Sequence, residues 1–140
     1  MSILLDLTSF RNGTPTPNYG SSLNRRHLVS LLADMSLQDE PGVGIDGVYR
    51  DPWGNPYIIT LDLDSNGKCR DPLYSKTEVS ASGSSTSGHY GLLRRPDTSG
   101  TDSYELDHRI MIWSLGPDGK ADPSTKANRG VNKDNVLGWE

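Results

Sequence analysis

The chain contains one cysteine and one phenylalanine among 140 residues, and its aromatic fraction is only 7%. The lone Cys69 excludes an internal disulfide, so neither an oxidising nor a reducing compartment follows from cysteine usage. With 33% hydrophobic residues, 15 glycines and 9 prolines, much of the chain must lie in turns and loops around a small core. The length is that of one domain, and we expect residues 1–140 to form a single globular domain.

Basic clusters and long apolar runs are also scarce. The close basic pairs are Arg25-Arg26 and Arg94-Arg95, and the formal net charge is −4. This balance argues against a nucleic-acid surface, because phosphate binding needs clustered Lys and Arg. No apolar run approaches the roughly 20 residues that span a bilayer, and we expect no signal peptide before the domain. The chain as it stands is therefore expected to be soluble.

The N-terminal part of the sequence predicts two helical segments. Residues 1–10 favour the last turns of a helix, which the turn-forming residues at 12–17 would end. A second helix is predicted from apolar residues spaced i, i+3, i+4 and i+7, which are Leu28, Leu31, Leu32 and Met35. Ser21 or Ser22 could cap this helix. We expect it to pack one face on a sheet.

Two strands are predicted further along the chain. Tyr57–Leu63 alternates as a strand does, and Ser65-Asn66-Gly67 favours the turn of a hairpin that returns through Cys69. Arg109–Leu115 carries apolar residues on both faces, which predicts a central strand covered on both sides. Between them, residues 75–103 include a tract rich in Ser, Gly and Thr that offers almost nothing to bury. We expect this range to form a flexible loop.

Three motifs rich in turn-forming and aromatic residues occur in a fixed order. They are Asp51-Pro52-Trp53-Gly54-Asn55-Pro56-Tyr57, Ser114-Leu115-Gly116-Pro117-Asp118-Gly119 and Lys133-Asp134-Asn135-Val136-Leu137-Gly138-Trp139. The first predicts a tight, buried, aromatic-anchored bend that feeds the strand after it. Together the three motifs resemble the globular domain of the major pseudopilin of type II secretion systems. In that family the first two motifs lie closer together, which would make 75–103 an insertion.

The resemblance implies an α+β, pilin-like fold. In it a truncated N-terminal helix packs on a small antiparallel β-sheet, and a long C-terminal loop is stabilised by a metal. Pseudopilins begin with a long apolar helix, and here only Ile3–Leu7 and Phe10 stand where that helix would be ending. The resemblance therefore implies that the N-terminal transmembrane helix is absent and that Met1 is an engineered start.

A calcium site in the C-terminal loop also follows from the resemblance. The residues that match the family's ligand positions are Leu115 and Asn132 through backbone carbonyls, and Asp118, Asp134 and Asn135 through side chains. Calcium binds six to eight oxygens in irregular geometry, which suits such a loop, and Trp139 is expected to pack beneath it. Asn135 stands where the family more often has a carboxylate, so the site loses a charge unless Asp122 contributes. The alternative is that Asp118 and Asp134 are only turn formers.

A second segment matches half of a calcium motif. Asp62-Leu63-Asp64-Ser65-Asn66-Gly67-Lys68 follows the first half of an EF-hand loop. The second half fails, because Leu73 occupies the place of the bidentate Glu and Pro72 disfavours the helix that should follow. We interpret this segment as a hairpin whose Asn-Gly turn needs no metal.

Catalytic residues have little support in the sequence. The histidines are scattered at His27, His89 and His108, and we predict that they are solvated surface residues. Asp107-His108 with Ser103 could suggest a triad, but the chain has no G-x-S-x-G elbow. A catalytic role for the Cys69 thiol is weak as well. We therefore expect a protein that is not an enzyme.

The tryptophans allow two interpretations. Exposed aromatic rings at positions 53, 113 and 139 could line a sugar or peptide site. In a chain with one Phe, however, the tryptophans are expected to form the core.

The function implied by the resemblance is structural. Pseudopilins polymerise with copies of themselves and with minor pseudopilins, contact inner-membrane secretion components, and support protein export across the outer membrane. The intact protein would lie in the periplasm, anchored in the inner membrane through its N-terminal helix alone. The alternatives are a type IV pilin-like or minor pseudopilin subunit in adhesion, and an extracellular carbohydrate-binding module.

Overall fold

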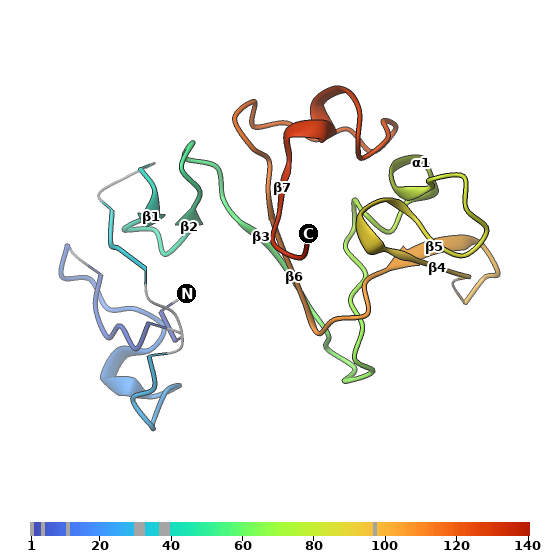
Figure 1. Ribbon diagram of the computed structural model, residues 1–140. Helices are drawn as coiled ribbons and strands as arrows, with labels where there is room; N and C mark the ends of the chain where they lie inside the picture. Colours follow the sequence, from blue (N-terminus) through green and yellow to red (C-terminus); the bar gives the residue numbers. More distant parts are fainter. Residues whose placement is uncertain (1, 4, 11, 30–32, 37–39, 97) are drawn as a thin grey trace. The chain divides into compact units, whose positions relative to one another are not determined.

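The computed structural model describes residues 2–3, 5–10, 12–29, 33–36, 40–96 and 98–140. The chain divides into two compact units, Met1–Tyr57 and Ile58–Glu140. Short helices and small antiparallel sheets make up both, which agrees with the expected α+β class (Figure 1). Within the described ranges, no helix has the length and apolar character needed to cross a bilayer. That the whole chain forms one domain stays a prediction.

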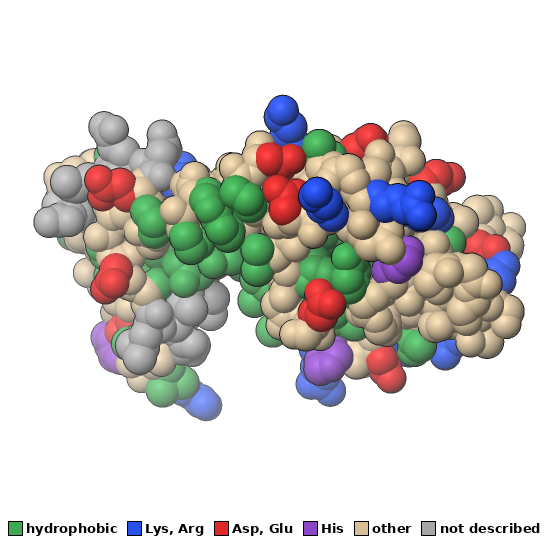
Figure 2. Space-filling model, turned by 45° about the horizontal axis from the view of Figure 1, so that its top comes forward, with side chains coloured by type: hydrophobic (Ala, Val, Ile, Leu, Met, Phe, Trp, Pro, Cys, Tyr) green, Lys and Arg blue, Asp and Glu red, His purple; other side chains and the backbone are tan. Residues whose placement is uncertain are grey.

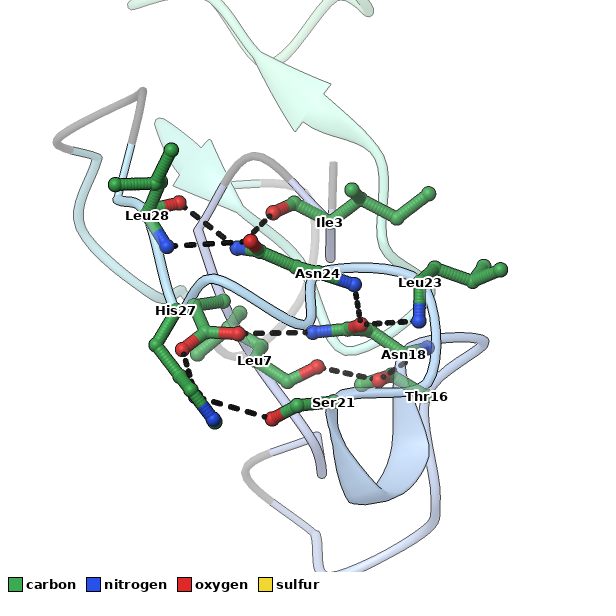
Figure 3. A network of polar contacts seen from close by, with 10 residues as sticks. Ile3, Leu7, Thr16, Asn18, Ser21, Leu23, Asn24, His27 and Leu28 are labelled. Carbon is green, nitrogen blue, oxygen red and sulfur yellow. Dashed lines mark hydrogen bonds and ion pairs between the residues drawn. The ribbon is translucent and has the colours of Figure 1, made fainter.

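The first unit is held together by polar side chains rather than by long elements. It contains η1 (Tyr19–Ser21), β1 (Gly42–Val43) and β2 (Tyr49–Arg50), with β1 antiparallel to β2. Asn18 is fully buried, and its Oδ1 accepts hydrogen bonds from the amides of Leu23 and Asn24 while its Nδ2 donates to Asp6 (Figure 3). One amide side chain therefore satisfies two backbone amides of the turn at residues 23–24 and ties that turn to Asp6.

The helices predicted in this unit are wrong for its described residues. Residues 2–3 and 5–10 form turns, and Ser9 pairs with Pro15 across a β-bridge. Residues 22–29 and 33–36 also contain no helix, and Leu28 is 57% exposed. Asn24 explains the second case, because its side chain bonds the amide and the carbonyl of Leu28 and so competes with helical pairing. Met1, Leu4, Leu31 and Leu32 lie outside the described residues.

The Asp51–Tyr57 bend is anchored by a buried carboxylate and by Tyr57, whose ring packs on Tyr49 with centroids 4.9 Å apart, but not by Trp53. Asp51 is buried, and its Oδ1 accepts hydrogen bonds from the amides of Trp53 at 2.9 Å and Asn55 at 2.8 Å. The Trp53 side chain, predicted to be buried, is 49% exposed. Sequence reasoning took the largest side chain as the anchor, but an Asx-type turn needs only the carboxylate.

The second unit contains the longer elements. They are β3 (Ile58–Leu61), α1 (Thr77–Ser80), η2 (His89–Gly91), β4 (Leu93–Pro96), β5 (Asp102–Glu105), β6 (Ile110–Ser114), η3 (Gly130–Asp134) and β7 (Val136–Leu137). Strands β3, β6 and β7 form an antiparallel sheet with β6 in the centre, and β4 pairs with β5. Figure 1 shows α1 beside the β4–β5 hairpin.

Strand β6 is central, as predicted, but the face that carries Ile110 and Ile112 is covered only near Ser114. Met111 and Trp113 point into the core, with 1% and 4% of their surface exposed. Ile110 and Ile112 alternate with them and are 51% and 40% exposed. The prediction of cover on both sides is therefore wrong for the described residues, because the buried cluster packs against a single face of the sheet.

The core of this unit is built around a buried carboxylate, Asp71. Its Oδ2 accepts hydrogen bonds from Trp113 Nε1 at 2.9 Å and from Thr60 Oγ1 at 3.0 Å. Its Oδ1 accepts from the amides of Leu73 and Tyr74. Asp71 thus joins β3 and β6 to the turn that leads to α1, and no sequence argument singled it out. The sequence feature that could have indicated this role is the Asp71-Pro72 dipeptide, since Asp before Pro favours turn initiation.

The chain reverses after β3, but not as the predicted hairpin. Cys69 pairs with Leu106 across a β-bridge and contacts β3 through its thiol, which donates to the Thr60 carbonyl, so it does not form a ladder with β3. Asp62 explains the difference, because it accepts hydrogen bonds from the amides of Asn66 and Gly67 and so closes a loop longer than a two-residue hairpin turn.

Residues 75–103 contain more secondary structure than their composition suggested. It contains α1, η2, β4 and the first half of β5. Ser80 is buried, and Ala81 pairs with Gly88 across a β-bridge at the base of the Ser/Gly-rich tract. Gly88 has a packing role, because a Cβ there would lie 2.6 Å from the Ser80 carbonyl oxygen. The mobility of this range stays a prediction.

Asp71→Asn should destabilise the second unit strongly. The substitution removes a buried charge and at least one of the oxygen acceptors that serve Thr60, Leu73, Tyr74 and Trp113. We expect a loss of about 2–4 kcal/mol in the free energy of unfolding. Urea unfolding followed by Trp fluorescence measures it, with Asp107→Asn at an exposed position as the matched control. Equal stability of the two variants would show that Asp71 does not organise the core.

Candidate metal centre

The loop between β6 and β7 brings two of the predicted motifs into contact. Ser114 pairs with Val136 in the β6–β7 ladder. Leu115 follows Ser114 in the chain and Asn135 precedes Val136, so both residues lie next to this pair. Gly116 has a φ of +66°, and a Cβ there would lie 2.0 Å from the Asp134 carbonyl oxygen. Only glycine permits this approach. The Ser-Leu-Gly motif is therefore explained by contact with the Asp134 backbone, which sequence reasoning missed.

Two oxygens at this junction lack hydrogen-bond partners. They are Asp134 Oδ1 and Asn135 Oδ1, and both are buried. The Asn135 amide is held at its other end, because Nδ2 donates to Tyr74 Oη at 2.9 Å. A buried oxygen without a donor costs free energy that a cation would recover. The unsatisfied carboxylate and amide oxygens are those of two residues predicted to ligate calcium through their side chains.

Tyr74 connects the junction to Trp139. The two rings meet edge to face, with centroids 5.4 Å apart and planes at 84°. Burial raises the pKa of Tyr74, while the hydrogen bond from Asn135 lowers it. The phenol therefore stays protonated and neutral beneath Asn135. The Trp139 ring contacts Tyr74, and its Nε1 donates to the Tyr90 carbonyl at 3.3 Å. That Trp139 packs beneath the loop stays a prediction.

Asn132 organises the loop in a way that the sequence did not predict. Its side chain is fully buried, with Oδ1 accepting from the Asp122 amide and Nδ2 donating to the carbonyls of Asp122 and Thr125. Its backbone carbonyl, the predicted ligand, accepts a hydrogen bond from the Asn135 amide at 3.4 Å. Asn132 thus fixes the loop through its amide side chain, three residues before the unpartnered oxygen of Asn135.

The remaining predicted ligands lie at the surface of the loop. Asp118 is exposed, and its Oδ1 accepts from the Lys120 amide at 2.9 Å in a local turn. Asp122, considered as a substitute, bonds the Ser124 amide and the Thr125 hydroxyl, and these bonds hold its pKa below the ordinary value. The structure therefore brings Leu115, Asp134 and Asn135 to one junction and leaves Asp118 in a turn that begins there.

The donor set at the junction suits a hard cation. It consists of one carboxylate, one amide oxygen and nearby backbone carbonyls, which are ligands that calcium accepts. Across the described ranges, no three His, Cys, Asp or Glu side chains gather as a metal-binding group. The five predicted calcium ligands would not form a group of this kind, because three of them would bind through backbone carbonyl or amide oxygens.

The Asp62–Lys68 segment is satisfied without a cation. Asp62 accepts from Asn66 and Gly67, and Asp64 Oδ2 accepts from Asn66 Nδ2 at 2.8 Å. Loss of hydration acts to raise the pKa of Asp62, but the hydrogen bonds from these amides bring it below its ordinary value. The segment was interpreted as a hairpin with an Asn-Gly turn. These bonds close a turn there, and the absence of a metal from the segment stays a prediction.

The residues considered for catalysis lie in unrelated surroundings. Ser103 donates its hydroxyl to the Ser75 carbonyl, and His108 is exposed. Cys69 is buried, and this burial raises the pKa of its thiol. His27 lies 3.0 Å from Asp6 Oδ2, whereas His89 is partly buried, contrary to the expectation of a fully solvated ring.

Comparison with protein-family models, with curated proteins and with solved structures finds no match to this chain.

A buried ion-pair cluster beside the Asp62–Lys68 loop centres on Glu105. Its carboxylate lies 2.8 Å from Lys68 Nζ and 3.2 Å from Arg70 Nε, with Arg95 Nε at 3.8 Å. Burial acts to raise the pKa of Glu105, but the hydrogen bonds from Lys68 and Arg70 lower it below the ordinary 4.5. A group with a lowered pKa stabilises the folded state while it is ionised.

Glu105→Gln should therefore cost stability at neutral pH and not in acid. We expect the free energy of unfolding to fall by about 1–2 kcal/mol at pH 7, since the basic partners are partly solvated. The difference from the unmodified protein should shrink as the pH falls below 4.5 and through the folded-state pKa. Urea unfolding at both pH values measures this. A difference that persists unchanged in acid would show that packing, not charge, is responsible.

Proposed function

We propose that this chain is the globular part of a structural subunit of a type II secretion pseudopilus. In this proposal the subunit has a pilin-like fold, is anchored in the inner membrane through an N-terminal helix, and extends into the periplasm. It polymerises with copies of itself and with minor pseudopilins, and it contacts inner-membrane secretion components. Its task is mechanical support of protein export across the outer membrane.

The observation that carries the proposal is the uncovered aliphatic face of the β3–β6–β7 sheet. Leu61 lies opposite Ile110, and Ile59 lies opposite Ile112, in the register of β3 and β6. These four side chains are 37–51% exposed, and Val136 on β7 is 47% exposed. Aliphatic side chains this contiguous are costly in water and mark a surface that another element covers. An apolar N-terminal helix, as in pilin-like proteins, would fit this face.

The second support is the junction of Asp134 and Asn135. A calcium ion there would pair with the unpartnered oxygens and with carbonyls of the loop. The ion would fix the junction between β6 and β7, where Gly116 already touches the Asp134 backbone. With Asn135 in place of a second carboxylate, the site has one negative charge fewer. We therefore propose a structural ion bound by the Asp134 carboxylate and mainly by neutral amide and carbonyl oxygens.

The metal would matter because this protein has a small core. An ion that binds only the folded state stabilises it by about 2.7 kcal/mol at a concentration one hundred times its dissociation constant. For a unit of this size, that corresponds to a rise of about 10 °C in melting temperature. A filament subunit that must bear load gains directly from such a rise.

Calcium should raise the melting temperature of the unmodified protein by about 10 °C over its value in chelator. Asp134→Ala should remove most of this rise, because it deletes the carboxylate at the junction. In chelator the same substitution should change the melting temperature little, since the loop without metal has already lost the contact. Differential scanning calorimetry in calcium and in chelator measures both effects.

The matched control is Asp107→Ala, which removes an exposed carboxylate of the same unit. It should respond to calcium as the unmodified protein does. Identical melting curves in calcium and in chelator for the unmodified protein would favour the turn-former interpretation of Asp118 and Asp134.

Deletion of the gene in its native host should reduce the export of secreted proteins and retain them in the periplasm. A complementing copy with Ile112→Lys should fail to restore export, because a charge on the aliphatic face blocks the docking of an apolar helix. Leu63→Lys, at a side chain that is 88% exposed in the loop after β3, is the matched control and should restore it. Normal export in the deletion strain would contradict the proposed function.

A further inference from the structure

A basic pocket lies between the Ser/Gly-rich tract and the loop that precedes η3. It has a volume of about 600 Å³ and is lined by His89, Lys126, Asn128 and Arg129, with Ser82 and Gly83 at its rim. No carboxylate contributes to this lining. On the face of the unit shown in Figure 2, a histidine lies close to Lys and Arg side chains. The pocket shares no lining residue with the junction of Asp134 and Asn135.

The cations of this pocket are not neutralised. Lys126 Nζ donates to the Thr77 carbonyl at 3.1 Å, which leaves its charge unpaired. Among the described residues, neither Lys126 nor Arg129 forms an ion pair with a carboxylate, whereas Arg94 pairs with Asp102 nearby in the chain. Partial burial lowers the pKa of His89, and the charges of Lys126 and Arg129 lower it further. Three basic groups therefore line one pocket, and no carboxylate lines it with them.

The backbone holds these basic groups in place. The Arg129 amide donates to the Lys126 carbonyl, which closes a turn, and the Ala127 amide donates to the Val79 carbonyl at 2.8 Å. Tyr90, next to His89, donates its hydroxyl to the Ala127 carbonyl at 3.5 Å. Like charges held together by a fixed backbone repel one another at a cost that an anion would offset. The arrangement is therefore prepared for an anionic ligand.

We propose that this pocket binds a phosphate or sulfate group, either as the free ion or as a monoester. The Arg129 guanidinium offers paired donors that match two oxygens of such a group, and the Lys126 ammonium, which spends one donor on the Thr77 carbonyl, adds a second positive charge. The Asn128 amide and the single N–H of a neutral His89 ring supply further donors. The pocket volume exceeds that of the ion alone, which leaves room for the substituent of an ester.

Titration of the protein with inorganic phosphate, inorganic sulfate and glycerol phosphate tests the proposal. NMR of the histidine ring signals follows binding at constant ionic strength set with sodium chloride. We expect saturable shifts of the His89 signals with each oxyanion, and no matching shifts of His27 or of exposed His108. Tighter binding of glycerol phosphate would identify a monoester as the preferred form, and equal binding would identify the free ion.

The variant Lys126→Gln with Arg129→Gln should weaken binding by about tenfold or more. Arg129→Gln alone, at an exposed position, should weaken phosphate binding by about threefold. This single variant replaces the double variant in the titration if the double variant does not fold. Arg109→Gln removes an exposed charge outside the pocket and should bind as the unmodified protein does. The proposal is overturned if His89 shows no saturable shift, if chloride produces the same shift, or if Arg109→Gln weakens binding as much as Arg129→Gln.

Discussion

The buried carboxylate of Asp71 is the constraint on which the second unit depends. Its two oxygens accept hydrogen bonds from β3, from β6 and from the turn that leads to α1, so a single side chain fixes three segments. Trp113 in turn meets Tyr74 edge to face, with ring centroids 5.1 Å apart. A core with few large apolar residues gains specificity from such a group, because a buried charge without its donors would be costly.

The same chain of contacts reaches the candidate metal centre. Tyr74 lies between Trp113 and Trp139, and its hydroxyl accepts a hydrogen bond from Asn135. Core packing thus orients the Asn135 amide, whose oxygen, like Asp134 Oδ1, has no hydrogen-bond donor among the described residues. The carboxylate at the centre of the unit and the unsatisfied oxygens at its edge are joined by two aromatic rings. A cation at the edge would therefore stabilise the part of the core that Asp71 organises.

Strand periodicity and turn chemistry predicted the β3 and β6 positions, because alternation along a strand is a local property of the sequence. The helix predicted around Leu28 was wrong in its described part, since the Asn24 side chain supplies the bonds that a helix would use. For the candidate site, the resemblance implied that residues 115 and 135 share a metal site, and the pairing of Ser114 with Val136 puts both next to the same pair of residues. Periodicity could not reveal the roles of Asp71, Tyr74 and the Asn132 side chain, which depend on contacts between distant segments.

Calorimetric titration of calcium into chelator-treated, dialysed protein tests the central claim most directly, because it counts ions without reference to stability. The proposed site at Asp134 and Asn135 predicts saturable binding of one calcium ion per chain, and loss of that binding in Asp134→Ala. Absence of saturable binding to the unmodified protein, or unchanged binding by Asp134→Ala, would contradict a metal centre at this junction.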